Sequence, residues 1–201
     1  MLGYPKGRNL SINGRTDRPK RGNEPLDSPV QQKLDEPWSP ADRLFMQRAI
    51  TLASHAEAQN EIPVGAVLVQ GGAIVGEGWN RPIGSSDPTA HAEIVALREA
   101  AANARNYRLG GATLYVTMEP CAMCAGAIVV ARVARLVFAA RDLRFGAVRS
   151  KFRLADSDLL NHRVVVEEGL LGAEAGEMLG RFFAARRMEG FGRGWRDQTR
   201  W

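Results

Sequence analysis

Two short motifs hold the residue types that can bind a metal ion and move protons. His91-Ala92-Glu93 sets an imidazole two residues from a carboxylate, and Pro120-Cys121-Ala122-Met123-Cys124 sets two thiols three residues apart. Zinc binds imidazole nitrogen and thiolate sulfur, and catalytic sites supply three protein ligands where structural sites supply four. His91, Cys121 and Cys124 make three, so we predict a catalytic site with one Zn2+ per chain.

Neither motif is decisive alone. A lone Cys-x-x-Cys is as typical of a redox pair or a structural zinc site as of a catalytic one, and a lone His-x-Glu usually lies on a protein surface. The remaining histidines, His55 and His162, have no partner at ligand spacing, which indicates ordinary surface or capping roles. The specificity comes from the joint occurrence of the two motifs, each at the start of a predicted helix.

The position of each motif at a helix N-terminus predicts how the ligands meet. Cys121 and Cys124 fall in one helical turn on the same side, and the positive end of the helix lowers the pKa of a thiol there. His91 also begins a helix. Because residues i and i+2 of a helix point apart, His91 and Glu93 can share a site only beyond the helix mouth. We therefore expect two helix N-termini to face one metal ion.

Charge counting assigns a task to Glu93. A Zn2+ ion with two thiolates and one neutral imidazole is formally neutral, so it acidifies water less than an all-histidine site does. A separate general base is then needed. Glu93 is placed to move a proton from water to the substrate.

Hydrophobic periodicity predicts the elements that must hold these residues. Ser39-Pro40-Ala41-Asp42 carries the signals of a helix start, and Gln70, Gly71 and Gly72 join two strands as a hairpin. Strands alternate with helices after it. This pattern predicts an α/β protein, a three-layer α/β/α sandwich with a mixed five-stranded sheet. The expected strands are 64–69, 73–77, 112–117, 135–140 and 163–167, and the expected helices start at 40 and span 89–104, 121–131 and 171–188, with a loop at 82–88.

Composition divides the chain of 201 residues into one domain and two tails. Residues 1–38 are basic and poor in large apolar side chains, so we expect a disordered extension, followed by a domain at 39–190 and a basic, aromatic tail at 191–201. The net charge of +5 is concentrated in 1–22, 141–153 and 181–201, which suits a polyanionic partner such as nucleic acid. No stretch has the length and apolarity of a membrane span.

From about residue 41 to 189 the sequence resembles the bacterial-type tRNA-specific adenosine deaminases of the cytidine deaminase superfamily. His-x-Glu with Pro-Cys-x-x-Cys is the signature of the zinc-dependent deaminases. The resemblance also covers Gly78-Trp79-Asn80-Arg81-Pro82, Asp87-Pro88-Thr89-Ala90-His91-Ala92-Glu93, and Arg141-Asp142.

The resemblance implies a cytidine-deaminase-like fold, the zinc ligands named above and Glu93 as the proton shuttle. It further implies that Asn80 contacts the purine nucleoside and that Asp142 lies near its ribose. The implied reaction is hydrolysis of adenosine to inosine in tRNA, at the wobble position of an anticodon stem-loop, by a cytoplasmic homodimer. Basic and aromatic residues suited to RNA are Arg141, Arg144, Phe183, Arg186 and Arg187.

Two alternatives are open, one among the deaminases and one that is not an enzyme. A free-base deaminase such as guanine deaminase shares the metal motif, but Asn80 and the basic segments favour RNA. A non-catalytic tRNA-binding subunit would keep the fold, but it has no use for Glu93.

Overall fold

The computed structural model describes residues 38–188. Within these residues ten helices and strands follow one another, in the order α2 (Pro40–Ala58), β1 (Gly65–Gln70), β2 (Ala73–Trp79), α3 (Pro82–Ser85), α4 (Ala92–Ala104), β3 (Thr113–Met118), α5 (Ala122–Val130), β4 (Arg135–Ala140), β5 (Val165–Glu168) and α6 (Gly172–Met188). Nine of them were expected from the sequence, and α3 is the one addition. The expected tails at 1–38 and 191–201 lie outside the described residues, apart from Trp38.

The five strands form one mixed sheet in the order β2-β1-β3-β4-β5. β1 pairs antiparallel with β2 and β3, whereas β3, β4 and β5 run parallel. The carboxyl ends of β2, β3 and β4 therefore meet at one end of the sheet, where β1 begins. The motifs follow these strand ends, so the topology gathers them at that end.

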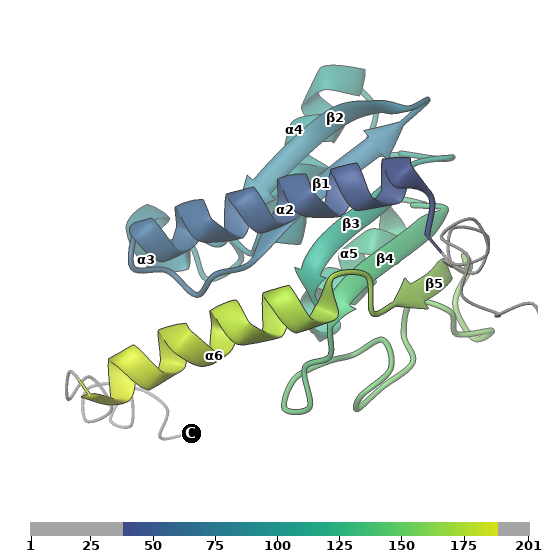
Figure 1. Cartoon of the computed structure of the whole chain (residues 1–201). Coiled ribbons are helices and arrows are strands. Elements are labelled where there is room, and N and C mark those ends of the chain that lie inside the picture. The colour runs from purple at the N-terminus through teal and green to yellow at the C-terminus, as the bar shows by residue number, and fades with distance from the viewer. Residues whose placement is uncertain (1–37, 189–201) are drawn as a thin grey trace, which may run out of the picture. The chain divides into compact units, whose positions relative to one another are not determined.

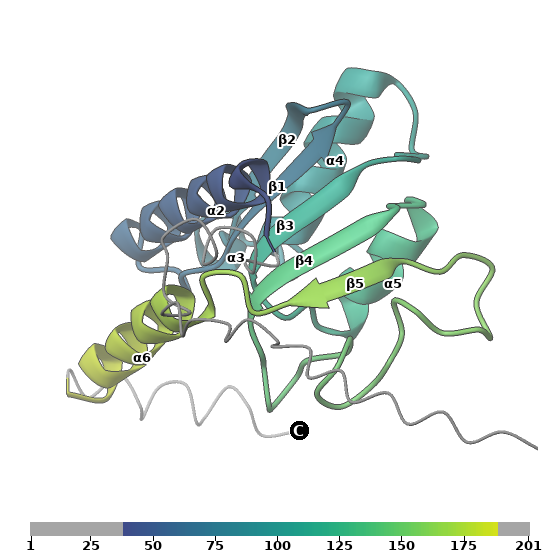
Figure 2. The same cartoon turned by 45° about the vertical axis from the view of Figure 1, so that its right-hand side comes forward.

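Helices cover both faces of the sheet (Figures 1 and 2). One apolar cluster lies between the sheet and α4 and α5, and it includes the fully buried Leu68, Leu114 and Phe138. A second cluster lies between the sheet and α2 and α6, with Met46, Val67 and Val137 fully buried. The three-layer α/β/α sandwich with a mixed five-stranded sheet is thereby confirmed.

Capping explains why α2 begins where the sequence predicts. The hydroxyl of Ser39 accepts a hydrogen bond from the N–H of Asp42, and the Asp42 carboxylate accepts one from the N–H of Ser39, which satisfies two helix-end donors at once. Asp42 also accepts hydrogen bonds from the Tyr115 hydroxyl at 2.7 Å and from Arg135 at 2.6 Å. The cap therefore ties α2 to β3 and β4.

Two glycines of β2 allow α4 to lie unusually close to the sheet. A Cβ atom on Gly76 would lie 2.3 Å from the carbonyl oxygen of Ala96, and one on Gly78 would lie 2.2 Å from that of Ala92. Only a residue without a side chain fits at such separations. Because Ala92 is the first residue of α4, this packing sets the position of the helix end that carries His91.

The start of α4 and the loop before it differ from the prediction. We expected Asp87-Pro88 to open a helix at 89, but the Asp87 carboxylate accepts hydrogen bonds from the N–H and the hydroxyl of Thr89 and so forms a turn. The helix begins three residues later, at Ala92. The expected loop at 82–88 contains the short helix α3, which Pro82 begins.

Candidate active site

His91 lies at the junction between the Asp87 turn and α4. Its backbone is extended, with φ −72° and ψ 153°, and it is the N-cap residue of the helix. Since it is not within the helix, the geometric conflict between residues i and i+2 does not arise. His91 can therefore face the same space as Glu93, as expected for a site beyond the helix mouth.

Cys121 has the matching place on α5. It is the N-cap of that helix, again with an extended backbone, and Cys124 follows in the first turn and is buried. The Nδ1 atom of His91 lies 3.7 Å from the Sγ of Cys121 and 3.6 Å from the Sγ of Cys124. The three side chains come together where two helix N-termini meet, as the sequence predicted.

This group of donors fits a zinc ion. Zn–S bonds of about 2.3 Å and Zn–N bonds of about 2.0–2.1 Å at tetrahedral angles separate N from S by about 3.6 Å, which matches the two distances above. Among residues 38–188, no other group of three His, Cys, Asp or Glu side chains has this geometry. His55 and His162 contact Gln59 and the carbonyl of Val133 instead.

Contacts within the cluster shift the pKa values of its members in different directions. A hydrogen bond from the Cys124 thiol lowers the pKa of Cys121, against the opposing effect of burial, and His91 lowers it further. A hydrogen bond to Cys121 in turn raises the pKa of His91. The hydrogen bond to Cys121 and burial raise the pKa of Cys124, so one sulfur is held as a thiolate and the other as the thiol that donates to it. Thiolate is the form that binds metals.

Glu93 is the buried carboxyl group beside this cluster. Its exposed fraction is 4%, and burial raises its pKa, while the charge of His91 acts in the opposite direction. A carboxyl group whose pKa is raised by burial accepts a proton more readily than an exposed one. This is the property that a proton shuttle requires.

Asn80 connects the end of β2 to the start of α4. Its side chain is almost fully buried, and its Oδ1 accepts a hydrogen bond from the N–H of Ala92 at 2.9 Å. Its backbone N–H donates to the carbonyl of Val64. Because Oδ1 is occupied, the amide nitrogen is the group that remains to contact a ligand.

Asp142 shapes the loop that follows β4. Its Oδ1 accepts hydrogen bonds from the N–H groups of Arg144 at 2.9 Å and Phe145 at 3.1 Å. Its carbonyl accepts one from Gly146, and Gly146 forms an isolated β-bridge with Cys121. The loop therefore turns tightly beside the cysteines.

Glu119 is a buried residue of this region that sequence reasoning missed. Its Oε1 accepts hydrogen bonds from the N–H groups of Val148 at 3.1 Å, Arg149 at 2.6 Å and Ser150 at 2.8 Å. Its Oε2 accepts from the N–H of Asp142 at 3.1 Å and from the Ser150 hydroxyl. One carboxylate thus fixes both ends of the loop 142–150. Glu119 itself stands only two residues before Cys121, so the loop is held beside that cysteine.

The residues predicted to contact RNA divide into two groups. Arg141 and Arg144 belong to the loop after β4, where Arg141 forms a two-pronged ion pair with Glu168 at 2.6 and 2.7 Å. Phe183, Arg186 and Arg187 belong to the last turns of α6, where Arg186 donates to the carbonyl of Asn60.

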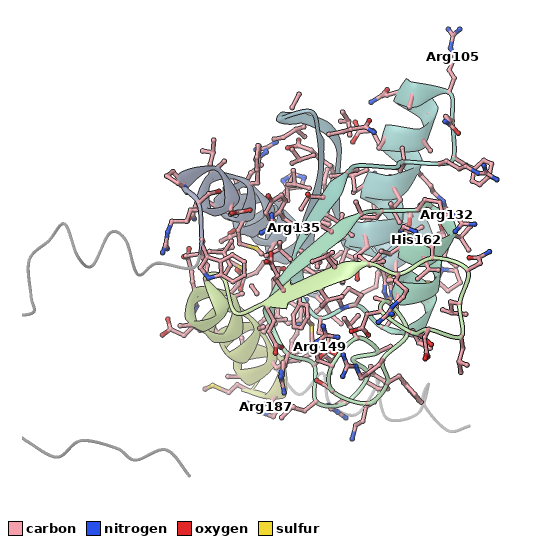
Figure 3. The ribbon with its side chains drawn as sticks, turned by 90° about the vertical axis from the view of Figure 1, so that its right-hand side faces the viewer. Arg105, Arg132, Arg135, Arg149, His162 and Arg187 are labelled. Atoms are coloured by element: carbon pink, nitrogen blue, oxygen red, sulfur yellow. The ribbon has the colours of Figure 1, made fainter. Side chains whose placement is uncertain are left out.

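Figure 3 shows both regions toward the end of the sheet to which β5 points. Arg149 marks the loop after β4 and Arg187 marks α6, whereas Arg132 and His162 lie at the opposite end. Since the metal-ligating residues follow the carboxyl ends of the strands, the predicted RNA contacts lie at the same end as the cluster.

A groove of about 760 Å³ is lined by Trp79, Arg81, Asp87 and Arg98, among others, and includes neither Glu93 nor the cluster. Asp87 already pairs with Arg98 at 3.2 Å, and the Arg81 guanidinium lies over the Trp79 ring. The chemistry therefore lies outside this groove.

The fold and the cluster together define the class of zinc-dependent deaminases, and comparison with known proteins agrees. The family described as "Cytidine and deoxycytidylate deaminase zinc-binding region" matches residues 39–140, and the chain belongs to this family. It is 54% identical, over 149 residues, to the tRNA-specific adenosine deaminase of Haemophilus influenzae. That alignment covers 74% of this chain and 86% of the relative.

Solved structures of deaminases are also similar to this chain. A structure from a study of A-to-I editing by tRNA:A34 deaminases at the wobble position is 42% identical, with a TM-score of 0.65, and the match covers 67% of this chain and 98% of that one. A guanine deaminase from Nitrosomonas europaea is 26% identical, with a TM-score of 0.63 over 81% of this chain and 94% of its own.

Proposed function

We propose that this chain is a tRNA adenosine deaminase, a hydrolase that converts adenosine to inosine at the wobble position of an anticodon stem-loop. The arrangement of His91, Cys121 and Cys124 beside the buried Glu93 supports the deamination chemistry. The 54% identity to a tRNA-specific adenosine deaminase carries the choice of substrate. Guanine deamination is the less supported alternative, since that relative is 26% identical.

His91, Cys121 and Cys124 would hold one zinc ion per chain, with the fourth position open. When bound, zinc supplies Lewis-acid activation of water. The protein contributes the orientation of the three ligands, which the two helix ends and the glycine packing of α4 set in advance.

Glu93 carries the protons of the reaction. Hydrolysis forms a bond between C6 and a water oxygen and breaks the bond between C6 and the exocyclic nitrogen. One proton of the water must therefore pass to N1 of the purine, where it stays in inosine, and the other to the amino group, which departs as ammonia. The carboxyl oxygens of Glu93 accept and return these protons. Its burial keeps the transfer out of bulk solvent.

Asn80 and Asp142 are proposed substrate contacts. The amide nitrogen of Asn80 donates a hydrogen bond to the purine, while its Oδ1 stays on the N–H of Ala92. Asp142 lies near the ribose and also holds the turn at 144–145. The side chains of Arg141, Arg144, Phe183, Arg186 and Arg187 then contact the flanking RNA.

We also propose a homodimer. The face of α5 away from the sheet is apolar and includes Met123, 36% exposed, and Val130, 65% exposed, with the small residues Ala122, Gly126 and Ala127 beside them. An apolar helix face of this kind is typical of a subunit contact. Substitution of Val130 by Glu should yield a monomer in analytical ultracentrifugation, and an unchanged mass would exclude this face.

The deaminase domain is proposed to span residues 39–190. No helix within residues 38–188 is long and apolar enough to cross a membrane. We propose that the activity is cytoplasmic, because the proposed substrate is tRNA.

The test is a comparison of substrates with the zinc-loaded full chain. An anticodon stem-loop with adenosine at the wobble position should be deaminated far faster than free adenosine, adenine or guanine, with inosine detected by nuclease digestion and mass spectrometry. The rate at low RNA concentration should fall as salt rises, because phosphate contacts release counterions. Preference for free guanine with no salt effect would exclude tRNA and leave the metal site intact.

A further inference from the structure

Large apolar side chains lie exposed at the tip of the loop after β4. Leu143 is 71% exposed and Phe145 is 67% exposed, and Arg144 stands between them. The ring of Phe145 is therefore available to a ligand on most of its surface. Aromatic rings that carry a neighbouring cation are the usual platform for unpaired bases.

The backbone that presents Phe145 is held in place. The Asp142 carboxylate accepts the N–H of Phe145 itself, and Glu119 accepts N–H groups at both ends of the loop. Gly146 packs so closely that a Cβ atom there would lie 2.4 Å from the Glu119 carboxylate. A fixed platform loses little conformational entropy when a ligand binds.

The platform stands next to the metal-ligating cysteines. Gly146, the residue after Phe145, forms the β-bridge with Cys121, and the N–H of Ala147 donates to the carbonyl of Pro120 at 2.8 Å. The residues on either side of a nucleotide bound at the cluster would therefore have this loop within reach.

The positive charge of Arg144, beside the ring, differs from that of the neighbouring arginines, which are paired with carboxylates. Arg141 pairs with Glu168, and Arg149 and Arg153 both pair with Asp156. Arg144 has no ion pair with any residue in 38–188, and its guanidinium lies 5.8 Å from the centre of the Phe145 ring. This cation can neutralise a phosphate while the ring stacks on the attached base.

We propose that Phe145 and Arg144 form a binding site for the nucleotide adjacent to the target adenosine, with its unpaired base on the ring and its phosphate on the guanidinium. This site rests on the proposed function, because it requires that the substrate be single-stranded RNA. It adds a subsite for one flanking nucleotide, which the cluster, Asn80 and Asp142 do not provide.

The experiment uses the zinc-loaded full chain and RNA hairpins whose loop carries one adenosine, with the fluorescent base 2-aminopurine on its 5′ side in one hairpin and on its 3′ side in the other. Stacking quenches this fluorophore. Phe145→Leu removes the ring and keeps an apolar side chain, whereas Phe145→Trp keeps a ring. Phe152→Ala is the matched control, since Phe152 is 58% exposed and lies further along the same segment.

The wild type and Phe145→Trp should quench the 2-aminopurine fluorescence of one of the two hairpins. Phe145→Leu should lose the quenching and raise the Kd for that hairpin by roughly 5- to 150-fold, which is the range for one stacked base, with zinc content unchanged. Phe152→Ala should match the wild type.

If the wild type binds and deaminates both hairpins while Phe145→Leu keeps full quenching and affinity, the platform is wrong and the proposed function survives. An equal loss in Phe152→Ala would also overturn it, because the effect would then not belong to the ring of Phe145. If the wild type binds neither hairpin, the proposed function fails and the platform fails with it.

Discussion

Replacing Glu119 by Gln tests whether one carboxylate holds the loop 142–150. The variant is almost isosteric, so any effect comes from hydrogen bonding and charge. Four backbone N–H groups and one hydroxyl donate to the Glu119 carboxylate. A glutamine has one acceptor oxygen in place of two, and its NH2 group must then face donors.

The cost can be worked from these contacts. If the amide oxygen takes the place of Oε1, three N–H groups keep a hydrogen bond but lose the charge of its acceptor, which costs about 1 kcal/mol for each bond. The N–H of Asp142 loses its acceptor altogether, which costs about 1–3 kcal/mol. Relief of the buried charge offsets about 2 kcal/mol of this sum. We expect the free energy of unfolding to fall by about 2–4 kcal/mol.

The assay is urea unfolding of Glu119→Gln beside Glu61→Gln. Both residues are 3% exposed, but the only hydrogen bond to the Glu61 carboxylate from residues 38–188 comes from the N–H of Gly84, at 2.7 Å. The control should therefore lose about 1 kcal/mol. Equal losses in the two variants would refute the reasoning, because the number of donors would then not determine the cost.

Four further outcomes are expected. Cys124→Ser should lose most of its zinc in elemental analysis, with part of the fold, because metal binding is coupled to folding; full zinc retention would remove it from the ligand set. Glu93→Gln should keep zinc and fold but lose about 100-fold or more in turnover, and near-normal turnover would assign proton transfer to another group. Gly78→Ala should destabilise the protein by several kcal/mol, of order 3, because its Cβ would lie 2.2 Å from a carbonyl of α4, whereas Gly110→Ala, with no atom within 4 Å, should cost less than about 1 kcal/mol. Burial and a hydrogen bond to a carboxylate raise the pKa of Tyr115 to about 12 from 10.0. The contribution of its hydroxyl to stability is therefore complete below about pH 10 and is lost as the pH rises toward about 12. Between about pH 9 and pH 11, the difference in free energy of unfolding between the wild type and Tyr115→Phe should shrink.

The sequence predicted that His91, Cys121 and Cys124 come together, as they do, because the signals are local. His91 and Cys121 each stand at a helix start, and short-range chemistry of helix ends is enough to orient them. The same local reading misplaced the start of α4, because Asp87 can cap either a helix or a turn. In the structure Asp87 caps the turn, because its carboxylate accepts hydrogen bonds from Thr89. The start of α4 then depends on how the helix packs on Gly78, which is a tertiary contact.

Glu119 and Phe145 could not be found in this way. The partners of Glu119 are backbone N–H groups more than 20 residues away. Because nearly every residue has such a group, the sequence does not show which of them bind Glu119. Phe145 resembles any loop phenylalanine until the bridge between Gly146 and Cys121 places it beside the cluster. Asp42 was predicted to favour the positive end of the first helix, but its bonds to Tyr115 and Arg135 depend on strand register.

The way Glu119 holds its loop has a consequence for how the enzyme can evolve. Four of its five donors belong to the main chain, and every residue type except proline supplies such a donor. Side chains at 143, 144 and 145 can therefore change without loss of the hydrogen bonds to Glu119. New preferences for the bases around the target can then arise by single substitutions, while the geometry of the metal ligands is inherited unchanged.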